Sequence, residues 1–317
     1  MNFEKIKILI KISRLDHFIK HLFIIPGIFF AVLLVPKNDL NLFNCILGFL
    51  SSFLIASSNY AMNEYLDKDY DKYHPKKKIR PLVNGNIISK NILFYCLSLY
   101  VISLIISSFI NIFFFYASFA FIFSALVYNI KPFRFKDIVY LDVIVESLNN
   151  PIRFFLGWFM VIDKFFLPPI SILLVYWLAG AFLMASKRLS EIRFFKKYSN
   201  LSNLIKYRKN YQKYNETNLL ISCLFYLMLL SFFIAIFLVK YRAELILLYP
   251  FVSLIFCYYL YLSLETINSK ISPDKVYLNT KLIFLIVSIS FFFIISMKYD
   301  LNFIRLIVNK TIEVDIN

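Results

Sequence analysis

The chain has 317 residues, of which 60% are hydrophobic and 19% aromatic, and its mean hydropathy is +0.69. Because soluble domains contain about 45–50% apolar residues, this composition excludes an ordinary water-soluble domain and indicates a chain that folds in lipid. A Gly-rich phosphate-binding loop is also excluded, since the chain has only five glycines and no two of them are neighbours.

Nine apolar segments are candidates to cross a membrane as helices. A bilayer requires about 20 apolar residues per helix, and lipid cannot satisfy a bare backbone. No small-residue cleavage site follows the first segment, so a secretory signal peptide is not expected. We predict an all-α, polytopic membrane protein with about nine transmembrane helices, in a single domain of residues 1–317. In chain order the segments lie at about 22–36, 42–64, 91–109, 112–130, 139–161, 166–186, 217–239, 244–264 and 282–297.

The 35 Lys and Arg residues produce a formal net charge of +16, and they are unevenly distributed among the connections. If all nine segments span the membrane, 27 of these cations lie on the side of the N-terminus and 7 on the other side. Lys and Arg are enriched in cytoplasmic loops, so we expect a cytoplasmic N-terminus, in the inner membrane of a bacterial cell. The positive charge then reflects topology and contact with membrane lipids, and no nucleic-acid partner is expected.

The second segment runs into a highly charged stretch, NEYLDKDYDKYHPKKKIRPLVNG, at residues 63–85. Asn63, Asp67 and Asp71 follow one another at intervals of four residues, so on a helix with 3.6 residues per turn they form one stripe of oxygen atoms. Asp69 points away from this stripe. Magnesium takes hard oxygen ligands, commonly one or two carboxylates together with substrate phosphates. The stripe is therefore a candidate magnesium site, with Asp67 and Asp71 as candidate catalytic residues.

Cationic side chains follow the stripe directly. His74, Lys76 and Arg80 are candidates to bind phosphate oxygens, and Pro75 and Pro81 restrict the backbone of the loop that carries them. The alternative interpretation is that the acids only end a helix and pair with nearby lysines. The adjacent cationic loop favours a metal–phosphate site.

The stretch resembles the first aspartate motif of the UbiA superfamily of intramembrane prenyltransferases, Asn-Asp-x-x-Asp-x-x-x-Asp followed by Arg-Pro-Leu. The resemblance implies that Asn63, Asp67 and Asp71 bind magnesium and diphosphate on an all-helical fold. Glu64 stands where the family has Asp, and it is a weaker candidate for the same site. The last three apolar segments carry no recognisable motif. The implied cytoplasmic loops lie near residues 63–90, 131–138 and 187–216.

Further ionisable residues lie in or beside other apolar segments. Arg14 and Lys20 precede the first segment, whereas Asp142, Glu146 and Arg153 lie in the fifth. Ionisable groups at membrane depth are costly and usually face one another or an aqueous cavity. Two interpretations remain open. The three residues of the fifth segment form either a structural polar network between helices or the wall of a substrate cavity, in which Arg153 contacts an anion. Arg14 and Lys20 are candidates to bind the diphosphate of the substrate.

The sequence departs from the family after the sixth segment, where UbiA prenyltransferases carry a second aspartate-rich motif for a second magnesium. This chain has SKRLSE at residues 186–191, in which Glu191 is the only carboxylate. Lys187 and Arg188 would neutralise phosphate there instead. Together with His-Pro-x-Lys-x-x-Arg-Pro and the Arg14…Lys20 segment, this pattern is similar to the decaprenyl-phosphate phosphoribosyltransferases, which attach 5-phosphoribose to a polyprenyl phosphate.

The sequence therefore supports a magnesium-dependent transferase that acts on a polyprenyl lipid and releases pyrophosphate. The preferred reaction is transfer of 5-phosphoribose from phosphoribosyl pyrophosphate to a polyprenyl phosphate. One alternative is transfer of a polyprenyl group from its diphosphate to an aromatic or other small acceptor. Another is a membrane transporter or helper protein without catalysis. Against the last, the acids cluster at one membrane face rather than at the midplane.

Overall fold

The computed structural model describes residues 3–35, 40–84, 89–241, 243–265, 279–299 and 304, and every regular element in these ranges is helical. The predicted all-α membrane fold is thereby confirmed. The α-helices are α1 (Phe3–Ile12), α2 (Ile25–Leu34), α3 (Leu42–Asp71), α4 (Pro81–Asn84), α5 (Ser89–Ile110), α6 (Ile112–Asn129), α7 (Leu141–Ser147), α8 (Asn149–Val161), α9 (Ile170–Tyr198), α10 (Leu201–Tyr207), α11 (Glu216–Tyr241), α12 (Tyr249–Leu264) and α13 (Thr280–Lys298). Short 3₁₀ segments are η1 (Leu15–Ile24), η2 (Phe135–Asp137), η3 (Lys209–Gln212) and η4 (Ala243–Leu248).

Six helical stretches among the described residues are long and apolar enough to cross a bilayer, so the predicted count of nine is not confirmed. They are Leu42–Asp71, Lys90–Ile110, Ile112–Asn129, Ile170–Tyr198, Glu216–Tyr241 and Glu244–Leu264. Two further apolar helices, Ile19–Leu34 and Thr280–Ser296, are shorter.

The remaining predicted segment, 139–161, is not one helix. It divides after Ser147 into α7 and α8. Pro151 has no backbone N–H to donate four residues back, and its ring disfavours a continuous helix. The break leaves Asp142 and Glu146 on α7 and Arg153 on α8, so these three groups need not serve one purpose.

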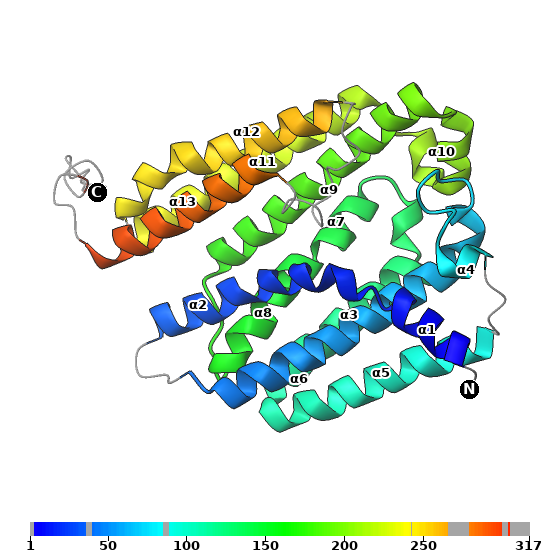
Figure 1. Ribbon diagram of the computed structural model, residues 1–317. Coiled ribbons are helices and arrows are strands. Elements are labelled where there is room, and N and C mark those ends of the chain that lie inside the picture. Colours follow the sequence, from blue (N-terminus) through cyan, green and yellow to red (C-terminus); the bar gives the residue numbers. More distant parts are fainter. Residues whose placement is uncertain are drawn as a thin grey trace.

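The helices run roughly lengthwise in one bundle (Figure 1). Helix α8 packs against α2, α3 and α6, and α9 packs against α8, α11 and α12. Helices α4, α10 and the N-terminal α1 lie together at one end of the bundle in Figure 1. The polar connections around residues 72–80, 130–140 and 199–215 therefore meet at that end.

Asparagine side chains begin several of these helices. Asn41 accepts hydrogen bonds from the N–H groups of Phe43 and Asn44 at the start of α3, at 3.0 and 3.2 Å. Asn111 accepts one from Phe114 at 2.8 Å and so separates α5 from α6. Such caps satisfy N–H groups that have no partner inside the helix.

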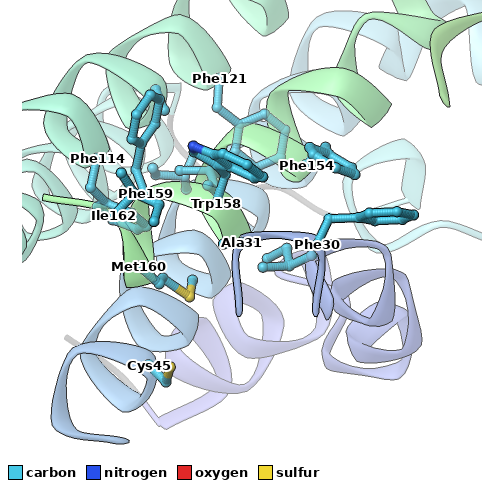
Figure 2. Packing of buried hydrophobic residues seen from close by; sticks show 14 of the residues in the cluster. Phe30, Ala31, Cys45, Phe114, Phe121, Phe154, Trp158, Phe159, Met160 and Ile162 are labelled. Atoms are coloured by element: carbon cyan, nitrogen blue, oxygen red, sulfur yellow. The ribbon is translucent and has the colours of Figure 1, made fainter. Parts of the chain in front are cut away.

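The largest buried cluster surrounds α8. Figure 2 shows Trp158 and Phe154 of α8 between Phe30 of α2 and Phe121 of α6. The backbones of α2 and α8 nearly touch, because a Cβ atom on Gly27 would lie 2.1 Å from the carbonyl oxygen of Phe154. Small residues allow this close approach between helices in lipid. The contact holds α8, which carries Arg153, firmly against the N-terminal helices.

Candidate functional site

The predicted oxygen stripe lies at the polar end of α3. This helix continues without interruption through Asp71, so Asn63, Asp67 and Asp71 occupy successive turns. Asp67 and Asp71 are 5% and 0% exposed, whereas Asp69 is exposed. The helix therefore directs the two carboxylates into the protein and Asp69 to its surface.

The Asp67 carboxylate faces two cations from the loop after α6. Its Oδ1 lies 2.5 Å from Nζ of Lys136 and 3.0 Å from Nη2 of Arg134. The Lys136 ammonium also donates to Oδ1 of Asn129 at 2.8 Å and lies 3.4 Å from Oδ1 of Asn63. Burial lowers the pKa of Lys136 to about 8, an effect that the Asp67 carboxylate opposes. A protein cation thus occupies a cage of three side-chain oxygens.

Asp71 has one paired and one unpaired oxygen. Its Oδ2 accepts a hydrogen bond from Arg80, and its buried Oδ1 has no hydrogen-bond partner among the described residues. Within those residues no three His, Cys, Asp or Glu side chains converge as metal ligands. Carboxylates and amides still fit magnesium, because it takes oxygen ligands and commonly shares its shell with substrate phosphates. The unpaired Oδ1 of Asp71 and the oxygens around Lys136 are oxygens of this chemical kind.

Glu64 has a different environment from the stripe. Its Oε2 lies 3.6 Å from Nη2 of Arg14, and its Oε1 accepts from the backbone N–H of Leu82 at 3.3 Å. Glu64 is 2% exposed. These contacts join the N-terminal segment to the start of α4, so Arg14 and Glu64 are partners of each other here.

The cationic loop after α3 packs on α9 and α10. The His74 ring lies 5.4 Å from that of Phe195 and 4.9 Å from that of Tyr207, and its Nδ1 accepts from the N–H of Lys76. Burial, with Lys77 nearby, lowers the pKa of His74 to about 3. His74 is therefore neutral at pH 7 and adds no positive charge. Lys77 donates to the Tyr207 hydroxyl, which ties the loop to α10.

Arg188 is the centre of a second cluster, on α9. It is 0% exposed, and its Nε donates to Oδ2 of Asp142 at 2.8 Å. Its Nη2 donates to Oε2 of Glu146 at 2.6 Å, and its Nη1 lies 3.8 Å from Oε2 of Glu191. Tyr214 donates to the other oxygen of Asp142 at 2.6 Å. Two acids of α7 and Glu191 of α9 thus all lie within ion-pair distance of one arginine.

A cavity of about 130 Å³ lies beside this cluster. Among its lining residues are Lys20, Tyr60, Glu146, Arg153 and Lys187. Lys187 lies 3.7 Å from Glu146, and the Lys20 ammonium lies over the Tyr60 ring. Three cations from three different parts of the chain therefore line one cavity.

The structure sorts the predicted residues into three groups. Asn63, Asp67, Asp71 and Arg80 come together in the first, Asp142, Glu146, Arg188 and Glu191 in the second, and Lys20, Arg153 and Lys187 in the cavity. His74, Lys76, Arg14 and Glu64 lie in the surrounding contacts, with Lys76 exposed over the Phe194 ring.

Sequence reasoning did not single out Asn129, Arg134, Lys136, Tyr128 or Arg208. Arg134 and Lys136 contact Asp67, and Asn129 accepts a hydrogen bond from Lys136. Arg208 lies 3.4 Å from the Tyr128 hydroxyl, beside Arg188. The only signal for Arg134 and Lys136 was two cations in a short polar loop. No local spacing links them to an aspartate 67 or 69 residues away.

Solved structures share this fold. A UbiA homolog from Archaeoglobus fulgidus bound to GPP and Mg2+ is 22% identical, with a TM-score of 0.64, and the alignment covers 92% of this chain and 97% of that one. The homolog bound to DMAPP and Mg2+ is 23% identical with a TM-score of 0.66, at the same coverage. A structure of a digeranylgeranylglyceryl phosphate synthase is 18% identical with a TM-score of 0.64, covering 94% of this chain and 100% of that one.

No curated protein sequence matches the chain. The sequence profile of the UbiA prenyltransferase family, in contrast, matches residues 24–297. This range contains the aspartate stripe, the cationic loop and the arginine cluster, and it spans most of the chain. The chain is therefore a member of the UbiA prenyltransferase family.

Proposed function

We propose that this protein transfers 5-phosphoribose from phosphoribosyl pyrophosphate to a polyprenyl phosphate. The observation that carries the proposal is the environment of Arg188. Asp142, Glu146 and Glu191 are all bound to this buried guanidinium. These acids are therefore already engaged in ion pairs with Arg188. The region that would hold a second metal in a prenyltransferase carries this cation instead. This arrangement fits a donor whose negative charge is neutralised mainly by cationic side chains.

The residues around Asp67 and Asp71 have the chemistry to promote loss of pyrophosphate. Bound magnesium, held by Asn63, Asp67 and Asp71, would supply charge that stabilises the leaving pyrophosphate. Arg80, beside Asp71, adds a fixed positive charge at the same place. Preorganised charge that faces the developing negative charge lowers the barrier without reorganisation of solvent. The ribose C1 becomes cationic as the pyrophosphate leaves, as the allylic carbon does in prenyl transfer.

Prenyl transfer is the second candidate, and the comparisons favour it. The Archaeoglobus fulgidus homolog was solved with GPP and with DMAPP, each together with Mg2+. On this reading a polyprenyl diphosphate is the donor and an aromatic or other small molecule the acceptor. Membership of an enzyme family leaves the transporter or helper alternative without support.

The orientation in the membrane is part of the same proposal. The polar end of α3, which carries the stripe, and the cationic loop after it lie at the end of the bundle where α1 lies (Figure 1). In the topology predicted from the sequence, 27 of the 35 Lys and Arg residues lie on this side of the membrane, which favours the cytoplasmic side. A water-soluble donor would reach the site from the cytoplasm of a bacterial cell, and the lipid from the inner membrane.

Transfer of label decides between the two reactions. Purified protein is incubated with MgCl2 and either phosphoribosyl pyrophosphate labelled in the ribose, with a polyprenyl phosphate, or a labelled polyprenyl diphosphate, with a small aromatic acceptor. The proposal expects label only from the first donor in a new lipid, with one pyrophosphate released per product. Transfer from the prenyl diphosphate alone would establish the second candidate.

A further inference from the structure

Arg153 is a buried cation with no counter-charge among the described residues. Its side chain is 9% exposed, and its Nε has no hydrogen-bond partner among the described residues. The guanidinium lies 5.0 Å from the centre of the Phe121 ring, and no carboxylate of the described chain lies within ion-pair distance of it. Burying an unpaired charge is costly, and ionisable groups inside membrane proteins usually serve a ligand or a pathway.

The cavity that Arg153 lines has the composition of an anion site. Lys20 from η1 and Lys187 from α9 also line it, and Glu146 is the only carboxylate among the described residues that line it, so these four side chains have a formal charge of +2. Asn150 presents an amide to the same space. Its volume of about 130 Å³ admits a phosphoryl group, since one water occupies about 30 Å³ of liquid. A phosphate monoester carries about −1.5 to −2 charge at pH 7, which matches this wall.

The position of the cavity along α3 places it deeper in the bundle than the aspartate stripe. On α3, Tyr60 of the cavity precedes Asn63 by three residues. With a rise of 1.5 Å per residue, the cavity lies about one turn deeper in the bundle than the aspartate stripe. A water-soluble donor reaches the stripe from the loop end. A lipid has its tail in the bilayer, so its head group approaches from the deeper side.

We propose that the cavity formed by Lys20, Arg153 and Lys187 binds the monophosphate head group of the lipid acceptor, separately from the donor at the aspartate stripe. This inference rests on the proposed function. In the reaction, an oxygen of the bound phosphate attacks C1 of the donor ribose. The bond between C1 and the pyrophosphate oxygen breaks, and pyrophosphate leaves with the electron pair. The acceptor monoester becomes a diester, and no proton has to be removed.

Binding measurements on the purified protein test the assignment with farnesyl phosphate as a short lipid monophosphate. The other probes are inorganic phosphate and phosphoribosyl pyrophosphate with MgCl2. Arg153→Gln should lower the affinity for farnesyl phosphate at least about tenfold, because it removes charge-assisted hydrogen bonds. It should leave the affinity for phosphoribosyl pyrophosphate unchanged. Asp71→Asn should do the reverse. Arg193→Gln is the matched control, since Arg193 is partly exposed and paired with Glu216 on the surface, and it should change neither.

Folding of the variants is checked by thermal unfolding. Arg153→Gln removes an uncompensated buried charge, so the ligand-free variant should melt at the same temperature as the wild type or higher. Arg153→Lys keeps the charge but loses the planar fork of donors. It should bind farnesyl phosphate with an affinity between those of Arg153→Gln and the wild type. This second variant keeps the test decisive if the first one fails to fold.

Three results would overturn the assignment. In the first, Arg153→Gln binds farnesyl phosphate as tightly as the wild type does. In the second, that variant loses as much affinity for phosphoribosyl pyrophosphate as for farnesyl phosphate. In the third, the wild type binds farnesyl phosphate no more tightly than inorganic phosphate. Failure of the proposed function gives a different pattern. In that case the wild type neither binds nor uses phosphoribosyl pyrophosphate, while farnesyl phosphate binding still depends on Arg153.

Discussion

Lys136 places its ammonium nitrogen 2.5 Å from Oδ1 of Asp67, and both side chains are buried. The same nitrogen contacts the side-chain oxygens of Asn129 and Asn63. A cation of the protein therefore lies among oxygens that the sequence assigns to a metal. Binding of magnesium at Asp67 has to displace or share the interactions of Lys136, and this coupling can be measured.

Lys136→Met tests that coupling, because methionine keeps much of the side-chain length without the charge. Breaking a buried ion pair costs roughly 3–5 kcal/mol, so we expect the metal-free variant to unfold at lower temperature. Added MgCl2 should restore more stability to it than to the wild type, as measured by thermal unfolding. Lys131→Met, at an exposed position of the same loop, is the control. Equal responses of variant and wild type to magnesium would contradict a metal site at these oxygens.

The three aspartates at the end of α3 should differ in their effect on turnover. Loss of outer partners of metal ligands already costs about 10- to 100-fold, so Asp67→Asn and Asp71→Asn should reduce kcat by at least about a hundredfold. Asp69 is exposed, and Asp69→Asn should retain most of the activity. Initial rates of pyrophosphate release measure all three variants. Similar losses at Asp67 and Asp69 would be inconsistent with the observed helical stripe.

Substitutions at the neighbouring residues Arg188 and Lys187 of α9 should have different effects, the first on folding stability and the second on substrate binding. Arg188→Lys cannot reproduce the hydrogen bonds to Asp142 and Glu146, and we expect it to lower the free energy of unfolding by roughly 3 kcal/mol. The Lys187 side chain is 23% exposed, so Lys187→Ala should fold normally and raise KM. Thermal unfolding and steady-state kinetics on both variants check this. A stable Arg188→Lys protein would show that the buried network contributes little to folding.

His74 should make stability depend on acid pH. Burial, with Lys77 nearby, holds its pKa at about 3 in the folded protein, against about 6.5 in an unfolded chain. The unfolded state therefore binds the proton first, and stability falls as the pH decreases from 6.5 towards 3. At pH 5 the loss relative to pH 7 is about 2 kcal/mol from this residue. His74→Gln should remove that part of the decrease in unfolding midpoint, and an unchanged pH profile would refute the assignment.

Accessibility of single cysteines should reveal the orientation in the membrane. In a variant whose exposed Cys257 is replaced by serine, Lys78→Cys and Lys209→Cys should react with impermeant thiol reagents from the cytoplasmic side. Lys164→Cys, in the connection between α8 and α9, should react only from the opposite side. All three positions are exposed. Labelling of Lys78→Cys and Lys164→Cys from the same side would contradict the orientation inferred from charge.

The all-α membrane fold and the family were predictable from the sequence, because both depend on local patterns. Apolar segments long enough for a bilayer must be helical there, and the family motif lies within 23 consecutive residues of the printed sequence, 63–85. The number of spans was less predictable. Pro151 divides one apolar segment, and only six helical stretches among the described residues satisfy the criteria of length and composition.

The stripe of Asn63, Asp67 and Asp71 was determined by the sequence alone, since one helix sets the direction of residues four apart. The tertiary structure alone decided what the stripe faces, because Lys136 reaches Asp67 only after α6 has folded against α3. The tertiary structure also gave Arg188 and Lys187, which are adjacent in the sequence, different environments. Adjacent residues on a helix point about 100° apart, so Arg188 is buried among acids while Lys187 lines the cavity with Arg153. Contacts between distant helices, which depend on packing rather than on spacing, made that distinction.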